Sequence, residues 1–438
     1  MIIIQFTKGF VMISRNLVVV FLAIFAMPSA LAVLEIKITE GRESALPIAV
    51  GKFEVSPNIE LGLDNPGEII LSDLIRSGYF KPAAELPKGL ASPDGVKRDY
   101  WRSKGINYVV VGEVIAQGPS LKVRYFLVDT LNKDASPILR SAEAVVTRTQ
   151  LRKYAHQISD AIFSLITGKQ SSFTSSIAYV LESDTKPKTY SLIYADYDGH
   201  NEVVLVKQNK ALMSPDISPD KRKIAYVSFE NDKSEIYIQD LYTGARTLVS
   251  GEKGINSSPV WSPDGKNLAM VLSPNNNVDI YSYNVASKRR TRLTRNKALD
   301  TEPFWFDNGQ KLVFTSSRGG SPQLYALDIR SGDINRLTFE GRYNVSGSFN
   351  QNDNRLLMVH RVESQYQVAI KNLDENVLTV LTQTNNNVAP SFSPDGNMIL
   401  YQTKSEQKSV LAVMSTDGEY KVTLPSPDGE VRDPIWSR

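Results

Sequence analysis

The sequence predicts an α+β amino-terminal domain followed by an all-β six-bladed β-propeller that is closed by the C-terminal strand. Three observations lead to this fold class. A turn motif recurs every 43 or 44 residues through the second half of the chain, and short β-rich runs flank each copy. One further copy stands at the end of the chain with no strands after it. The first half has no such repeat and alternates helical with strand patterns.

The first residues have the pattern of a cleaved secretory signal, which we assign to residues 1–32. Basic residues precede an apolar run over 17–27, and the small-residue pattern Ala30-Leu31-Ala32 follows it. A membrane-spanning helix is the alternative, but it needs about 20 apolar residues. The start codon is Met1 or Met12. Cleavage removes two basic and no acidic residues, which lowers the formal net charge from +3 to +1.

The predicted mature terminus, residues 33–41, alternates apolar and polar side chains. It reads Val33, Leu34, Glu35, Ile36, Lys37, Ile38, Thr39, Glu40 and Gly41. Alternation of this kind suits an edge strand that adds to the sheet of a partner. Pairing inside its own domain is the alternative.

Residues 42–170 are predicted to form the α+β domain. Their apolar patterns indicate buried strands at 48–50 and 108–111, a half-buried strand at 121–129, and helices at 69–78, 98–105 and 151–168. The last helix ends on a glycine, a common stop signal. The serine-rich residues 171–176 are the predicted linker to the next domain.

Residues 177–438 are predicted to form the propeller. An anchor residue before the turn recurs at Ile217, Trp261, Trp305, Phe349, Phe392 and Trp436, often followed by Ser-Pro-Asp-Gly. Four short strands per 44-residue unit are typical of a propeller blade. The unit that begins at Ile177 lacks an anchor strand, so the spare strand at Trp436 is expected to complete it. Residues 349–353 lose the Ser-Pro-Asp-Gly motif, which leaves that turn's geometry open.

Composition removes several kinds of chemistry. The chain has no cysteine, which excludes disulfides, thiolate nucleophiles and cysteine-ligated metals, and its three scattered histidines argue against a histidine-rich metal site. Its 50 basic and 47 acidic residues indicate no nucleic-acid footprint. No serine-hydrolase, phosphate-loop or zinc-protease motif occurs, so we expect no cofactor and no metal. Residues 196–199 resemble the start of a calcium loop, but the glutamate that ends such a loop is missing, and a hairpin turn is the better interpretation.

The loops that lead into the innermost strands form the mouth of the predicted propeller. The candidate partner-binding residues there are Met213, Ser214, Pro215, Ser257, Ser258, Pro259, Asp300, Thr301, Glu302, Pro303, Val388, Arg432 and Asp433. This polar mouth suits a protein loop or helix. A hydrolase that uses Glu302 and Asp433 is an alternative, although these carboxylates belong to blades on opposite sides of the ring. A purely structural module is another.

Several motifs together resemble one family. They are Tyr108–Gly112 in the first domain, Ile177–Val180 and Asp196–Gly199 in the first blade, Trp261–Gly265, and Thr301–Pro303. With the export signal and the order of domains, they are similar to the TolB family, the periplasmic components of the Tol-Pal system of Gram-negative bacteria. The resemblance covers the whole predicted mature chain.

The resemblance implies a non-enzymatic periplasmic adaptor. It implies binding of the lipoprotein Pal through the propeller mouth and of the inner-membrane protein TolA through residues 33–41. Its role would be outer-membrane integrity and envelope constriction during cell division. The resemblance leaves room for other outer-membrane proteins as further partners. Binding of nucleic acid and direct insertion into a membrane are not expected. We expect a monomer outside its complexes, in which Pal binding could change the availability of residues 33–41 to TolA.

Overall fold

The computed structural model describes residues 45–438, except 63, 86–89, 133–136, 351–352, 384–385 and 426. The described residues belong to one compact unit. The predicted signal, residues 1–32, and the predicted partner-binding strand, residues 33–41, lie outside the described residues.

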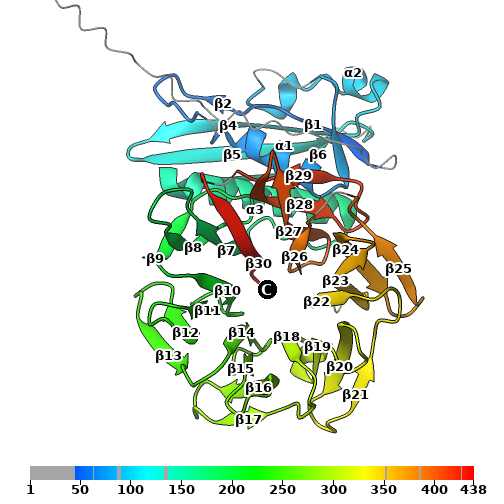
Figure 1. The fold of residues 1–438 in the computed structure, drawn as a ribbon. Helices are drawn as coiled ribbons and strands as arrows, with labels where there is room; N and C mark the ends of the chain where they lie inside the picture. Colours follow the sequence, from blue (N-terminus) through cyan, green and yellow to red (C-terminus); the bar gives the residue numbers. More distant parts are fainter. Residues whose placement is uncertain are drawn as a thin grey trace, which may run out of the picture. The chain divides into compact units, whose positions relative to one another are not determined.

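The amino-terminal domain is a mixed sheet with helices (Figure 1). Its strand order is β3-β1-β4-β5-β6, and β2 also pairs with β4. Strand β1 runs parallel to β3 and β4, whereas β4, β5 and β6 are antiparallel. The strands are β1 (Leu46–Val50), β2 (Glu54–Val55), β3 (Phe80–Pro82), β4 (Tyr108–Gln117), β5 (Ser120–Asp129) and β6 (Ile138–Val146).

The helices are α1 (Pro66–Arg76), α2 (Arg98–Ser103) and α3 (Leu151–Thr167), with short 3-10 turns at Pro93–Gly95 and Arg148–Gln150. Helix α1 begins after Asn65, whose side chain accepts a hydrogen bond from the Gly67 amide at 3.0 Å. Helix α3 ends at Gly168, which has a φ of 70°, as the glycine stop signal predicts. The three predicted helices are therefore confirmed, within a few residues at their ends.

The second part is a six-bladed propeller of four-stranded antiparallel sheets (Figure 1). Five blades are each built from four consecutive strands. The first three of these are β10 (Leu212–Ile217) to β13 (Arg246–Ser250), β14 (Asn256–Trp261) to β17 (Arg290–Arg292), and β18 (Asp300–Phe306) to β21 (Ile334–Arg336). Their middle strands are β11 (Lys223–Ser228), β12 (Glu235–Asp240), β15 (Asn267–Leu272), β16 (Asp279–Asn284), β19 (Lys311–Ser316) and β20 (Gln323–Asp328).

The next two blades are β22 (Asn344–Asn350) to β25 (Val377–Val380) and β26 (Val388–Phe392) to β29 (Lys421–Thr423), with β23 (Arg355–Val362), β24 (Gln365–Asn372), β27 (Met398–Ser405) and β28 (Lys408–Ser415) between them. The remaining blade has the order β30-β7-β8-β9, from β30 (Glu430–Trp436), β7 (Ser176–Glu182), β8 (Tyr190–Asp196) and β9 (Val203–Gln208). Trp436 pairs with Ile177, which confirms closure of the ring by the C-terminal strand. The turn after Asn350 lies partly outside the described residues, but β22 and β23 still pair.

The aspartates of the Ser-Pro-Asp-Gly repeats serve the turns. In one copy, Ser262 donates from Oγ to Asp264 at 2.6 Å and accepts from the Asn267 amide at 2.9 Å. The copy at Ser393 and the variant copy at Ser218, which has Lys221 in place of the glycine, make the same contacts. These side chains replace backbone hydrogen bonds that a tight turn cannot make.

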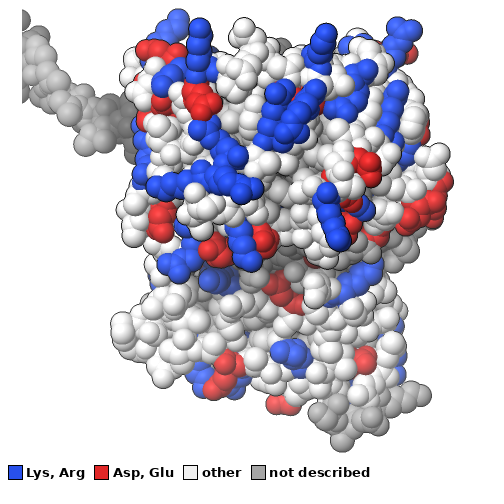
Figure 2. Space-filling view, turned by 90° about the horizontal axis from the view of Figure 1, so that it is seen from below, with Lys and Arg blue, Asp and Glu red and all other residues white. Residues whose placement is uncertain are grey.

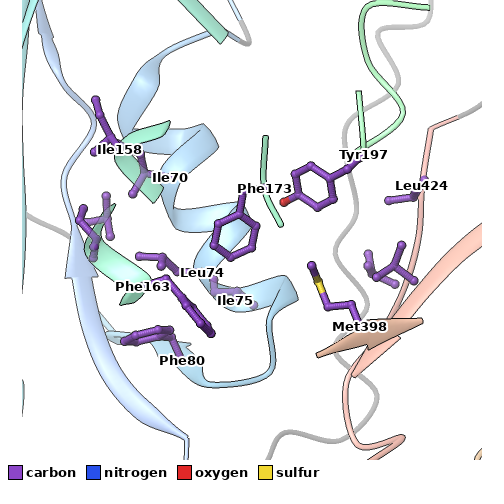
Figure 3. Close-up of a cluster of buried hydrophobic side chains, with 14 of the residues drawn as sticks. Ile70, Leu74, Ile75, Phe80, Ile158, Phe163, Phe173, Tyr197, Met398 and Leu424 are labelled. Carbon is purple, nitrogen blue, oxygen red and sulfur yellow. The ribbon is translucent and has the colours of Figure 1, made fainter. Parts of the chain in front are cut away.

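The two domains share one apolar core. Figure 3 shows Leu74 and Phe163 from the helices of the first domain beside Phe173, with Tyr197 and Met398 of the propeller on its other side. The Phe173 ring centroid lies 5.7 Å from that of Phe163 and 5.7 Å from that of Tyr197. The predicted linker, residues 171–176, therefore passes through this core with Phe173 only 1% exposed. Its apolar burial ties the domains together.

Candidate protein-binding mouth of the propeller

Six residues in the left-handed backbone region form a ring at the mouth. They are Ser214, Ser258, Glu302, Ser346, Ala389 and Asp433, with φ values from 47° to 54°. Each lies in the inner strand of a different blade, where the pairing with the second strand shifts register. A bulge of this kind bends its strand and re-aims the bulged side chain. The repeat thus places one strained residue per blade around the channel.

The residue after each bulge is proline in five blades and Gly347 in the sixth. Proline suits this position because its fixed φ matches a short bend and it needs no ladder partner. A Cβ atom on Gly347 would lie 3.0 Å from a methyl carbon of Leu324. The Leu324 side chain thus occupies part of the space in which a larger residue would sit at 347.

The mouth encloses a cavity of about 210 Å³. Seven predicted site residues line it, namely Ser214, Pro215, Ser258, Pro259, Glu302, Pro303 and Asp433. Residues outside that prediction line it too: Asp216, Val260, Phe304, Ser346, Gly347, Ser348, Ala389, Pro390, Pro434 and Ile435. Five of these, Asp216, Val260, Phe304, Ser348 and Ile435, follow a ring residue by two positions, where pairing with the second strand resumes after the bulge. The 44-residue register of the repeat was a signal that could have located them.

The other predicted site residues do not line the cavity. Met213, Ser257, Thr301, Val388 and Arg432 directly precede ring residues, and Met213 is 44% exposed. The remaining one, Asp300, is 0% exposed, and both of its carboxylate oxygens accept hydrogen bonds from Arg318 at 2.9 Å. Its contact with a partner, like that of the other twelve residues, stays a prediction.

The two ring carboxylates bind the neighbouring blade. Asp433 accepts a hydrogen bond from the Ser214 amide at 2.9 Å, and Glu302 accepts one from the Ser346 amide at 2.8 Å. Glu302 also accepts from the Thr315 hydroxyl at 2.7 Å. Burial raises the pKa of Asp433, while the hydrogen bond from Ser214 opposes that rise. Each carboxylate is thus a link between adjacent inner strands, three blades from the other carboxylate.

The Arg438 side chain binds Asp216, a residue that lines the mouth cavity. Its Nη2 atom binds both oxygens of Asp216, at 2.7 and 2.8 Å, and its guanidinium lies 4.6 Å from the ring centroid of Phe304. A second cavity of about 300 Å³ is lined by Arg438 and shares Phe304 and Ser348 with the mouth cavity. The Arg438–Asp216 ion pair therefore links the linings of the two cavities, with Asp216 in the first and Arg438 in the second.

A buried charged cluster joins the two domains. Asp73 of α1 accepts hydrogen bonds from Tyr197 at 2.5 Å and from Ser159 at 2.6 Å, and lies 2.8 Å from Nδ1 of His156. On the propeller side, Asp198 pairs with Arg152 of α3 and, at 3.6 Å, with Arg76 of α1. The two carboxylates and two guanidiniums balance each other in formal charge. Residues 196–199 do form the expected turn between β8 and β9, but Asp198 also anchors this cluster.

Electrostatics hold this cluster in its ionised form. Burial alone would raise the pKa of the Asp198 carboxyl, but the hydrogen bond from His200 and the charges of Arg76 and Arg152 hold it well below its usual range. Burial lowers the pKa of His156, but Asp73 outweighs it, and the net pKa lies above 6.5.

Asp73, His156 and Asp198 are residue types that bind metal ions, and their ligand atoms lie within 4.8 Å of one another. Both carboxylates, however, already carry partners. Two guanidiniums also lie where a cation would have to approach. The donor set therefore fits an interdomain salt bridge better than a metal centre.

Among the described residues, no helix combines the length and apolar character that crossing a bilayer requires. The family model for the TolB beta propeller domain matches residues 163–438, and the model for the TolB amino-terminal domain matches residues 34–135. The chain is 49% identical over 415 residues to the Tol-Pal system protein TolB of Nitrosococcus oceani, covering 94% of each chain.

A second relative is the protein of the same name from Pseudomonas aeruginosa, which is 45% identical over 427 residues, or 95% of this chain and 98% of that one. Among solved structures, the crystal structure of TolB from Acinetobacter baumannii superposes with a TM-score of 0.83 at 35% identity. It covers 92% of this chain and 98% of that chain. The similarity thus extends over both domains in the same order.

Proposed function

Because the chain belongs to the TolB family of Tol-Pal system proteins, we propose that it is a non-enzymatic adaptor in the periplasm. It binds the lipoprotein Pal through the propeller mouth and TolA through residues 33–41. In this role it supports outer-membrane integrity and envelope constriction during cell division. The observation that carries the proposal is the ring of six left-handed residues around one cavity.

The mouth has the features of a protein-binding site. Its cavity of about 210 Å³ is below the usual range for small-molecule sites, about 300 to 1,000 Å³, so it suits a few side chains of a protruding loop. Exposed Met213 and Arg432 stand beside it, and methionine and arginine are enriched in protein interfaces. All six ring residues lie at bulges, and interblade hydrogen bonds join Ser214 to Asp433 and Ser346 to Glu302. The surface is therefore preorganised, and binding a partner orders little of it.

A matched pair of threonines tests the mouth. Thr301 precedes a ring residue, whereas Thr379 is exposed on the outer strand β25. Thr301→Trp should weaken calorimetric Pal binding by about tenfold or more, because a bulky group beside the mouth would keep the partner from close contact. Thr379→Trp should leave the affinity unchanged. Equal affinities for both variants would count against the mouth.

Deletion of residues 33–41 tests the second partner. The shortened protein should lose TolA binding in a pull-down and keep its calorimetric affinity for Pal, because the two contacts use separate parts of the chain. Loss of both TolA and Pal binding would contradict the assignment of residues 33–41 as the TolA-binding segment.

The alternatives have their own signatures. A hydrolase would turn over a substrate, and turnover would disappear in Glu302→Gln or Asp433→Asn. The placement of both carboxylates as interblade links favours the adaptor. If the protein were a purely structural module, a periplasmic pull-down with it as bait, analysed by mass spectrometry, would recover no partner. The same experiment would find any further outer-membrane partner.

A further inference from the structure

A strongly basic segment lies on the outer edge of one blade. Residues 288–297 read Lys-Arg-Arg-Thr-Arg-Leu-Thr-Arg-Asn-Lys, with six basic and no acidic residues. The segment comprises the end of the turn after β16, the outermost strand β17, and most of the connection to β18. We call these six basic residues the basic stripe. They are Lys288, Arg289, Arg290, Arg292, Arg295 and Lys297.

The other blades show that the blade fold does not require this charge. The segments at the same place in the repeat are 200–209, 244–253, 332–341, 376–385 and 419–428. Their formal charges lie between −1 and +1, against +6 for the basic stripe. A charged edge strand can also serve to prevent aggregation, but five other outer strands do so with far fewer charges. The concentration of charge therefore calls for a specific cause.

Internal ion pairs neutralise only part of the basic stripe. Arg290 pairs with Glu252 and Arg292 pairs with Asp279, each at 2.5 Å. The other four side chains are exposed, and within the described part of the chain they form no ion pair. An excess of four positive charges is thus left to solvent along one blade.

The basic stripe lies away from the mouth. Strand β17 lies at the lower edge of the molecule in Figure 1. Figure 2 shows the molecule from below, and many Lys and Arg side chains lie on this face, with some Asp and Glu among them. β17 is the outermost strand of its sheet, whereas the ring residues belong to the innermost strands. A partner on this edge would leave the mouth open.

We propose that the basic stripe adsorbs to a bilayer surface that carries anionic lipid head groups. The charges are spread along an edge strand and its two flanking connections, an arrangement that a plane of negative charge can meet without a shaped pocket. An added peptide strand is a poorer occupant, because β17 has only three residues and two of them already hold carboxylates. The balanced net charge of the whole chain conceals this local excess. Adsorption needs no inserted segment and is independent of the proposed Pal and TolA contacts.

Vesicle sedimentation with the full mature chain tests the proposal. The probes are phosphatidylcholine vesicles with and without phosphatidylglycerol, at low and at physiological salt. The test variant replaces Lys288, Arg289, Arg295 and Lys297 with glutamine. The matched control replaces four exposed lysines elsewhere that form no ion pair with the described residues, namely Lys81, Lys153, Lys207 and Lys404. Both variants change the net charge by the same amount.

The unaltered chain should sediment only with phosphatidylglycerol-containing vesicles, and added salt should release it because screening weakens surface attraction. Each basic residue near an anionic surface adds to the attraction, so the test variant should bind at least about tenfold more weakly than the unaltered chain. The control should bind like the unaltered chain. An equal loss in the control, equal binding to neutral vesicles, or binding to duplex DNA without binding to vesicles would overturn the proposal. Circular dichroism establishes that both variants are folded.

Discussion

Replacement of Asp198 by asparagine should destabilise the protein far more than its small change in shape suggests. The Asp198 side chain is 0% exposed and faces Arg76 and Arg152, which are 2% and 9% exposed. Removal of one partner from a buried ion pair costs about 3–5 kcal/mol because the remaining charge is left unsolvated. Among the described residues, the carboxylate that Arg152 keeps is Asp64 at 3.2 Å, whereas the carboxylate that Arg76 keeps is Asp73 at the longer distance of 3.8 Å. Most of the cost should therefore come from Arg76.

Urea unfolding followed by tryptophan fluorescence and far-UV circular dichroism measures this cost. Trp101 reports on the first domain, and Trp261, Trp305 and Trp436 report on the propeller. In the double variant Arg76→Met/Asp198→Asn, part of the lost stability should return because the uncompensated charge is gone. The exposed control Asp333→Asn should shift stability by less than about 0.5 kcal/mol. An Asp198→Asn loss below about 1 kcal/mol, or simple addition of the two single losses, would refute the reasoning.

Two further predictions concern the same interface. Because the pKa of His156 is raised above 6.5, the stability that its charged form contributes is complete below pH 6.5 and is lost as pH rises through the raised pKa. The urea midpoint of the unaltered chain should therefore fall as pH rises across that range, and it should fall less for His156→Gln. Identical pH dependence of the two midpoints would contradict this. Trp436 is 1% exposed, and its ring centroid lies 6.0 Å from that of Tyr197, so Trp436→Ala should cost about 3–5 kcal/mol in urea unfolding, whereas a loss below about 1 kcal/mol would show that the closing strand does not depend on this packing.

The propeller could be predicted because its repeat keeps a fixed register. A turn residue such as Asp264 recurs at the same interval as its neighbours, and the spare anchor at Trp436 identifies the closing strand. The helices of the first domain could be predicted from their apolar period and, for α3, from Gly168. These signals are local, and the structure keeps them.

The geometry of the mouth could be predicted only in part. The loops that carry Ser214 and Glu302 follow from the repeat, but a left-handed backbone at serine or glutamate has no sequence signal, since glycine and asparagine are the residues that favour it. The interdomain cluster was missed for another reason. Asp73 and Arg76 look like an ordinary surface pair on a helix, and only the packing of α1 against the propeller buries them.

The pairing of Trp436 with Ile177 also sets a timetable for folding. The two residues are 259 positions apart in the chain, so the blade that holds β7 is completed by a contact of very long sequence separation. Contacts of this kind form slowly because the entropy of closing a long loop must be lost before they stabilise the chain. Until β30 pairs with it, β7 presents an unpaired edge rich in apolar residues, which is a template for association with other chains. Pairing of β30 with β7 thus ends the period in which this part of the chain is most exposed to aggregation.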